Sequence, residues 1–108
     1  MSPFARADLF WSTERVAEAL SDPLLRVIDC RFSFEGDSRA EYLAGHLPGA
    51  IHCDWSRDLS APPPPSGHPR WMLLDAKGFA AAMARLGIGD DTTVIGYDAE
   101  GGPPAARL

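Results

Sequence analysis

Three short, mainly aliphatic segments alternate with helical segments along this chain of 108 residues. The aliphatic segments are 24–30 (LLRVIDC), 50–53 (AIHC) and 92–97 (TTVIGY). Short aliphatic runs of this kind are typical of strands that are buried on both faces of a sheet. Because strands that alternate with helices pair in parallel, the pattern predicts an α/β fold with an open parallel sheet and helices on both faces.

The first two helices are predicted from their ends. Ser12 is a suitable N-cap for a helix over 13–22, which Pro23 then stops. Residues 39–44 (RAEYLA) have the composition of a second, short helix. We expect Gly45 to end that helix in the left-handed conformation.

Two further helices are predicted in the second half of the chain. The segment 76–86 is a strong helical pattern that Gly87 ends. Its apolar face is formed by Phe79, Met83 and Leu86. Pro104 stands at a first-turn position and opens another helix, AARL.

The segment 58–70 is predicted to be a proline-rich surface loop. Its run of four prolines, 62–65, is stiff because proline fixes φ and has no N–H donor. An alternative role for this run is as a ligand for an SH3 or WW domain.

The charge and the apolar segments exclude several classes of partner. Fifteen acidic side chains against ten basic ones give a net charge of −5, which argues against a nucleic-acid binder. The apolar runs are far shorter than the ~20 residues that a membrane span needs. The first residues have no apolar core of a secretory signal. We therefore expect a cytoplasmic protein with no nucleic-acid or membrane partner.

Two cysteines, Cys30 and Cys53, lie in predicted strands. A single pair is no disulfide framework, and free cysteine is among the most buried residue types. We interpret both as reduced core thiols. The alternative, that one of them carries a persulfide, is kept open.

Candidate chemistry is predicted at the carboxyl ends of the strands, where open α/β sheets bind ligands. These ends are 29–31, 53–55 and 98–102. The last leads directly into a helix N-terminus, which would stabilise an anion or activate a nucleophile. Asp98 stands there, and a carboxylate is a poor acceptor of sulfur or phosphate.

Other kinds of site fit less well. Only three residues separate Cys53 from Arg57, which is too few for the phosphate-binding loop of a cysteine phosphatase. His52 and His68 have no partners at metal-ligand spacing, so we expect neither a metal nor another cofactor. The tryptophans are interpreted as anchors for helices and loops. The turn of His46, Pro48 and Gly49 is interpreted as structural, with the histidine bonded to the backbone.

Three segments together resemble the rhodanese superfamily: RVIDCR, RAEYLAGHLPGAIHCDW and FAAAMARLGIGDDTTVIGYD. More narrowly, the chain looks like the N-terminal domain of tandem-domain thiosulfate and 3-mercaptopyruvate sulfurtransferases. The resemblance covers residues 12–108, and the most specific motif is YLAGHLPGA. It implies one rhodanese-like domain over 1–108, of the N-terminal type and incomplete at its C-terminal end, without its last helix and strand.

The resemblance also implies a function. Catalytic members carry sulfane sulfur on a cysteine at the position of Asp98, whereas the N-terminal domain of the tandem enzymes lacks that cysteine. We therefore expect a sulfurtransferase domain that is inactive by itself and forms one wall of an interdomain active site. An aspartate and a histidine of the mercaptopyruvate enzymes fall here on Ser56 and Trp71, which departs from the pattern. The candidates for the wall are Arg31, Asp54, Ser56, Asp58, His68 and Trp71.

The resemblance finally implies a partner, a C-terminal catalytic rhodanese domain in the same longer protein or in a separate chain. A sheet without its last strand exposes an apolar face, so we also expect self-association. The alternative function is a stand-alone, non-catalytic rhodanese-like module that binds a protein or an anion.

Overall fold

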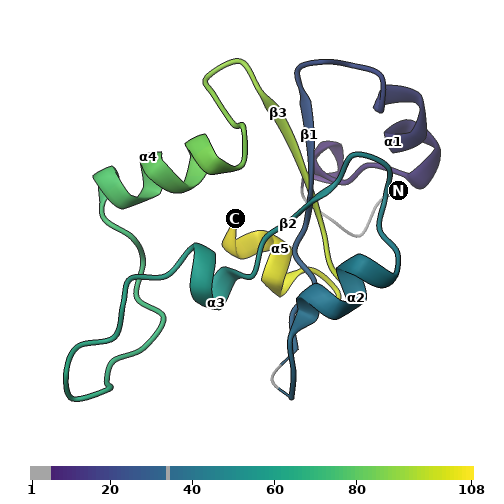
Figure 1. Cartoon of the computed structure of the whole chain (residues 1–108). Coiled ribbons are helices and arrows are strands. Elements are labelled where there is room, and N and C mark those ends of the chain that lie inside the picture. The colour runs from purple at the N-terminus through teal and green to yellow at the C-terminus, as the bar shows by residue number, and fades with distance from the viewer. Residues whose placement is uncertain (1–5, 34) are drawn as a thin grey trace.

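The computed structural model describes residues 6–33 and 35–108, and it is an α/β fold (Figure 1). In chain order the elements are η1 (Ala7–Leu9), α1 (Thr13–Ala19), β1 (Leu25–Asp29), α2 (Ser38–Ala44), β2 (Ile51–His52), α3 (Trp55–Asp58), α4 (Ala76–Arg85), β3 (Thr93–Tyr97) and α5 (Pro103–Arg107). All three predicted strands are present, each one or two residues shorter than predicted. The fold class is confirmed.

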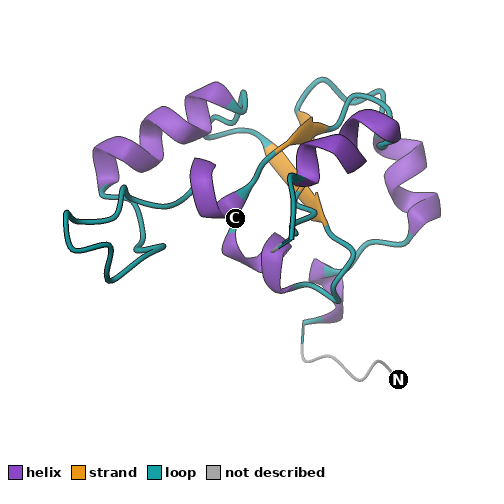
Figure 2. Ribbon diagram, turned by 60° about the horizontal axis from the view of Figure 1, so that its bottom comes forward, coloured by secondary structure: helices purple, strands orange, loops and turns teal. Residues whose placement is uncertain are grey.

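The described strands form one parallel sheet in the order β2-β1-β3. Ile28 pairs with Ile51 on one side of β1 and with Gly96 on the other. All three strands therefore end at the same edge of the sheet. Figure 2 shows this small sheet with helices around it.

The sheet separates two hydrophobic clusters, because side chains alternate between its faces. Leu25 and Val27 point to one cluster, against which Leu20 of the segment after α1 packs. Ile28 points to the other cluster, which contains Ala82 of α4. Helices thus cover both faces, as predicted.

Four of the helices begin at a side-chain cap. Ser12 accepts a hydrogen bond from the Arg15 amide at 3.1 Å, which confirms its predicted role at the start of α1. Asp37, Asp54 and Asp75 do the same for α2, α3 and α4. Each cap satisfies an amide that the helix itself leaves without a partner.

Several local predictions were wrong. Gly45 has φ 173, an extended conformation, so the predicted left-handed cap of α2 is absent. Helix α1 ends at Ala19 rather than at residue 22, because the chain turns at 20–24 before β1. The short helix α3 was not predicted, since four residues are too few to show a helical period.

The segment between α3 and α4, residues 59–75, has no helix or strand and extends away from the sheet (Figure 1). A single antiparallel bridge between Ser60 and Leu73 joins its two ends. It contains the exposed prolines of 62–65. Within the part of the chain that the structure describes, every helix is too short or too polar to cross a membrane.

Candidate active-site wall at the carboxyl ends of the strands

The Asp98 carboxylate is held by the backbone amides of the loop that follows β3. Oδ1 accepts from the amides of Glu100 and Gly102, and Oδ2 accepts from Ala105, at 2.9–3.0 Å. Burial alone would raise the pKa of Asp98, but these hydrogen bonds favour the charged form and hold the pKa below its usual value. The loop therefore forms a cradle for one negative charge, and the chain's own carboxylate fills it.

A cavity of about 280 Å³ opens beside this loop. Its lining comes from the segments that follow all three strands: Phe32, Trp55, Glu100, Pro103, Pro104 and Arg107. This is the edge at which parallel sheets place their ligands. The cavity is mainly aromatic and aliphatic, with one carboxylate and one guanidinium in its lining.

Arg107 of α5 links the cavity to the long loop. Its Nη2 donates to the Trp71 carbonyl and lies 3.3 Å from the Ser60 hydroxyl. Trp71 in turn packs edge-on against Trp55, with ring centroids 5.2 Å apart. The candidate Trp71 is thus brought next to the cavity by folding, because it lies 36 positions before Arg107 in the chain.

The candidate Arg31 lies in a structural ion pair. Its guanidinium contacts the Asp29 carboxylate at 2.7 Å and donates to the carbonyl of Gly45. Asp29 is completely buried and also accepts from the Tyr97 hydroxyl. Burial would raise the pKa of Asp29, but the hydrogen bonds from Arg31 and Tyr97 outweigh it and lower the pKa. This network ties the ends of β1 and β3 to α2.

The candidates Asp54, Ser56 and Asp58 form the cap of α3. Oδ1 of Asp54 accepts from the Ser56 amide and hydroxyl, and Oδ2 of Asp58 accepts from the Asp54 amide. The three polar side chains therefore hold one another at the end of β2 and fix the start of α3. Trp55, the first residue of that helix, is positioned at the cavity by the same cap.

The two remaining histidine candidates lie elsewhere. His68 is exposed in the long loop, where the Ser66 hydroxyl donates to its carbonyl. His46 places Nδ1 2.7 Å from the Tyr42 carbonyl and stacks on the Tyr42 ring, which confirms the predicted bond to the backbone. Gly49, which ends that turn, has φ 76 and so adopts a conformation that glycine favours.

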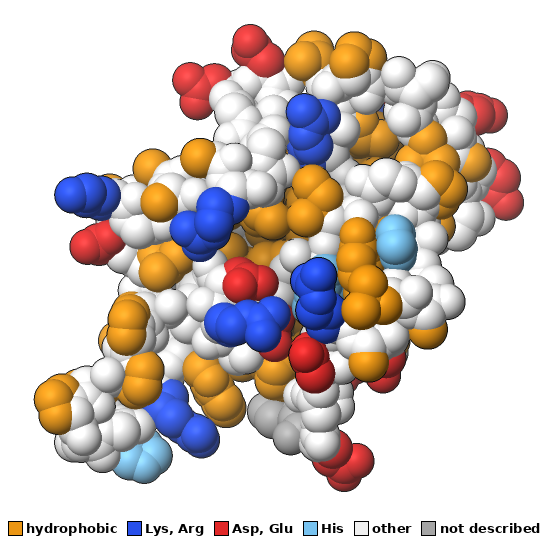
Figure 3. All heavy atoms as spheres, in the orientation of Figure 1, with side chains coloured by type: hydrophobic (Ala, Val, Ile, Leu, Met, Phe, Trp, Pro, Cys, Tyr) orange, Lys and Arg blue, Asp and Glu red, His pale blue; other side chains and the backbone are white. Residues whose placement is uncertain are grey.

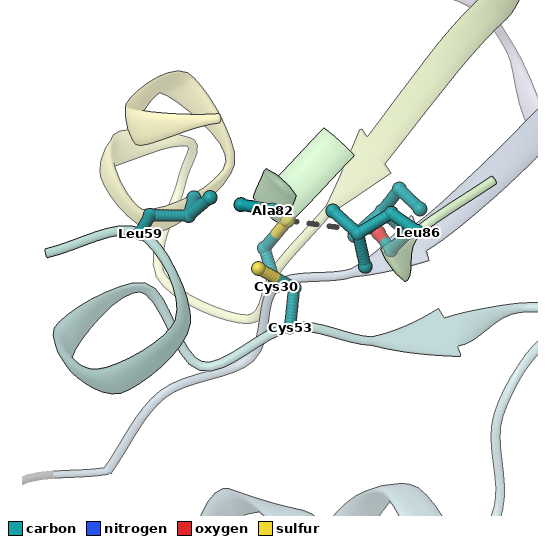
Figure 4. Packing of buried hydrophobic residues seen from close by; sticks show 6 residues of the cluster. Cys30, Cys53, Leu59, Ala82 and Leu86 are labelled. Atoms are coloured by element: carbon teal, nitrogen blue, oxygen red, sulfur yellow. Dashed lines mark hydrogen bonds between the residues drawn. The ribbon is translucent and has the colours of Figure 1, made fainter. Parts of the chain in front are cut away.

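Both cysteines are free thiols in the core, as predicted (Figure 4). Cys30 and Cys53 are each 1% exposed. Burial raises the pKa of both thiols to about 12, so the nucleophilic thiolate is strongly disfavoured. This argues against either cysteine as the carrier of a persulfide.

Sequence reasoning missed most of the cavity. Phe32, Glu100 and Arg107 were not candidates, because nothing in their local sequence distinguishes them. The available signal was position: Phe32 and Trp55 each follow a strand by three residues. Among residues 6–33 and 35–108, no group of three or more histidine, cysteine or acidic side chains is placed to hold a metal ion.

The fold and this edge define a parallel α/β domain whose last strand leads into an amide-lined loop at a helix N-terminus. Residues 12–108 match the Rhodanese-like domain family. The chain belongs to that family.

Several curated relatives are sulfurtransferases. The chain is 38% identical over 98 residues to the probable 3-mercaptopyruvate sulfurtransferase of Pseudomonas aeruginosa, covering 89% of this chain and 34% of the relative. It is 35% identical to the sulfur carrier protein TtuD of Thermus thermophilus, covering 87% of this chain and 29% of the relative. It is 36% identical to the thiosulfate sulfurtransferase of Bos taurus, covering 83% of this chain and 30% of the relative. The predicted resemblance to sulfurtransferases is confirmed. The chain spans about a third of the length of these relatives.

Proposed function

We propose that this chain is the N-terminal, non-catalytic rhodanese-like domain of a sulfurtransferase and forms one wall of an active site completed by a catalytic rhodanese domain. The observation that carries the proposal is Asp98. Its carboxylate stands at the end of β3 in the amide-lined loop, where the family resemblance implies a sulfur-bearing cysteine in catalytic members. A carboxylate already holds a negative charge and does not accept sulfane sulfur as a thiolate does.

The cavity beside the loop supports the role of a wall. Trp55, Trp71 and Arg107 combine flat apolar surface with a guanidinium, which suits a partner domain and an anionic sulfur donor. Of the residues proposed from the sequence, Trp71 packs against Trp55 of the cavity, and Asp54 and Ser56 cap the helix that carries Trp55. Asp58 completes that cap but lines a separate hollow. Arg31 is proposed to act by holding the strand ends in place. His68 lies in the long loop and would come to the site only if that loop brought it there.

The first experiment is a thiocyanate assay of the 108-residue chain with thiosulfate and cyanide, beside the Cys30→Ser and Cys53→Ser variants. The same set is run with 3-mercaptopyruvate as donor. We expect no turnover from any of the three, because the two thiols are buried and protonated and Asp98 is no sulfur acceptor. Turnover that one serine substitution abolishes would overturn the proposal and make that cysteine the sulfur carrier.

A second experiment addresses the partner. The coding region downstream of Leu108 is read, and a further ~150 residues with a cysteine-bearing loop would support a tandem enzyme. In that longer protein, Arg107→Ala and Trp71→Ala should lower kcat/KM for thiosulfate. A stop codon at this point, together with the absence of turnover, would favour the stand-alone binding module instead.

A further inference from the structure

A second hollow lies at the β2 edge of the sheet and shares no lining residue with the cavity beside Asp98. It has a volume of about 230 Å³ and an apolar floor that includes Ala82 and Leu86 of the core. Its polar lining comes from α2, β2, α3 and α4: Arg39, His52, Arg57, Asp58 and Arg85. Figure 3 shows several Lys and Arg side chains gathered in the middle of this face.

The charge of this hollow is opposite to that of the whole chain. Three guanidinium groups line it against the single carboxylate of Asp58, whereas the chain carries a net charge of −5. Three of the ten basic side chains are thus gathered at one small hollow by elements that are far apart in the sequence. Converging positive charge of this kind attracts anions and raises their local concentration.

The guanidinium groups of Arg39 and Arg85 are available to a ligand. Within residues 6–33 and 35–108, neither has a hydrogen bond or an ion pair. Among the same residues, the guanidinium of Arg57 has only a 3.4 Å contact with Asp58, and its side chain is 59% exposed. By contrast, the guanidinium of Arg31 is engaged by a carboxylate and that of Arg107 by a carbonyl.

His52 adds a hydrogen-bonding ring to the lining of the hollow. Its Nε2 lies 3.0 Å from the hydroxyl of Ser38, a residue that is 1% exposed. When Ser38 donates to Nε2, the ring proton lies on Nδ1. In the part of the chain that the structure describes, Nδ1 has no hydrogen-bond partner, and His52 is one of the residues that line the hollow.

The size and the donors select the class of ligand. Forked guanidinium donors match pairs of oxygens on one atom, as in phosphate or sulfate. A volume of 230 Å³ is below the ~300–1,000 Å³ typical of sites for drug-sized ligands. It holds a tetrahedral ion together with a few waters, since each water takes about 30 Å³ of liquid volume.

We propose that the hollow bounded by Arg39, His52, Arg57 and Arg85 binds a tetrahedral oxyanion of sulfur or phosphorus. The three candidates of this chemistry are thiosulfate, sulfate and phosphate. The site is built from side chains of four elements rather than from loop amides, and Asp58 limits the charge that it accepts. This proposal does not depend on the function proposed for the Asp98 edge, because the two sites have separate linings.

The test is an NMR titration of the 108-residue chain with each of the three ions at constant ionic strength, with sodium chloride as the balancing salt. The signals followed are the backbone amides and the arginine Nε–H groups. We expect saturable shifts at Arg39, Arg57 and Arg85 with a dissociation constant of about a millimolar, because the arginines are exposed and screened. Saturable binding of all three ions supports the proposal, and a preference for one of them also identifies the ligand.

Two variants and one matched control make the test specific. Arg39→Ala and Arg85→Ala should each weaken binding by at least about fivefold. Lys77→Ala removes one positive charge from the same helix as Arg85 but not from the hollow, and it should leave the affinity unchanged. Both arginines are exposed, so we expect the variants to keep the fold. The dispersion of their amide signals in the same spectra checks this.

Three outcomes would overturn the proposal. The first is the absence of saturable shifts with any of the ions. The second is a set of shifts centred on the Asp98 loop. The third is a Lys77→Ala variant that binds as weakly as Arg85→Ala, which would reduce the effect to overall charge. The NMR titration measures binding alone, so its outcome is separate from that of the thiocyanate assay of the proposed function.

Discussion

The hydroxyl of Tyr97 donates a 2.9 Å hydrogen bond to Oδ2 of Asp29, a residue 68 positions earlier in the chain. Asp29 is the last residue of β1 and Tyr97 the last of β3, so the bond joins the two strand ends beside the candidate active-site wall. Because Asp29 is completely buried, its charge depends on this donor and on Arg31.

Removing the Tyr97 hydroxyl should destabilise the domain. Tyr97→Phe is expected to lower the free energy of unfolding by about 1–3 kcal/mol, because a buried carboxylate loses a donor. The measurement is urea unfolding followed by circular dichroism. In a double-mutant cycle with Asp29→Asn, the double variant should lose less unfolding free energy than the sum of the two single losses. Strict additivity would contradict the pairing.

Acid should destabilise the fold through Asp29 and Asp98. Burial raises their pKa values, but the hydrogen bonds they accept outweigh it, so both are lowered in the folded state. A lowered pKa contributes stability that is present above the unfolded value of about 3.9 and is lost as the pH falls through the folded value. The urea midpoint, measured from pH 7 to pH 2.5, should therefore decrease once the pH is below about 4.

The urea midpoint of the Asp98→Asn variant is expected to fall less steeply over that range, since the substitution removes one of the two titrating carboxylates. Asp90→Asn, a change in an exposed turn, is the matched control and should follow the original chain. Equal slopes for Asp98→Asn and Asp90→Asn would contradict the role of the amide-held carboxylate.

Alkali should destabilise the fold through the two thiols. Burial raises the pKa of Cys30 and of Cys53 to about 12, whereas an unfolded cysteine ionises near pH 8.5. A raised pKa contributes stability that is complete below the unfolded value and is lost as the pH rises toward 12. Replacing both cysteines by alanine should flatten the decline in unfolding free energy above about pH 8.5.

The same burial predicts slow chemical modification. At pH 8, Ellman's reagent should react with neither thiol in the native chain and rapidly with both in denaturing urea. Fast labelling of either cysteine without urea would show an accessible thiol and contradict the core position of that residue.

Gly87 ends α4 in a conformation that other residues adopt at a cost. Its φ is 73, and a Cβ atom there would lie 3.0 Å from Nε of Arg26. Gly87→Ala is expected to lower the unfolding free energy by about 1–2 kcal/mol. Gly89→Ala, two residues further on, meets nothing within 4 Å and should be close to neutral. Thermal unfolding of the pair measures the difference, and equal melting temperatures would refute it.

Phe79 lies on an apolar face that we expect a second copy of the chain to cover. Its side chain is 47% exposed, and it lines an apolar hollow of about 400 Å³ with residues of α4, β3 and α5. The chain is expected to self-associate at micromolar concentration, because this face and the open edge of β3 lie together. Sedimentation velocity over a range of concentrations measures the association.

Phe79→Asp should shift the chain toward the monomer. Leu43→Asp, which changes an apolar residue on α2 that is 65% exposed, is the control and should leave the association unchanged. A well-behaved monomer of the original chain at these concentrations would contradict the prediction.

The sequence by itself determined the three strands, the longer helices and their order. The aliphatic segments are strands, Ser12 begins α1 and Gly87 ends α4, because these features depend on side-chain pattern and on the conformations of a few neighbouring residues. The placement of Asp98 after the third strand is local in the same way. It could therefore be predicted that this loop carries a carboxylate and no thiol.

Only the tertiary structure decided which residues meet. The Tyr97–Asp29 bond, the contact of Trp71 with Trp55 and the convergence of Arg39 with Arg85 join residues that are far apart in the chain. The Tyr97–Asp29 bond depends on the pairing of β1 with β3 and on its register, which local patterns do not encode. Burial works in the same way: two cysteines in apolar segments suggested core thiols, but the packing of α4 against the sheet is what removes them from water and raises their pKa values.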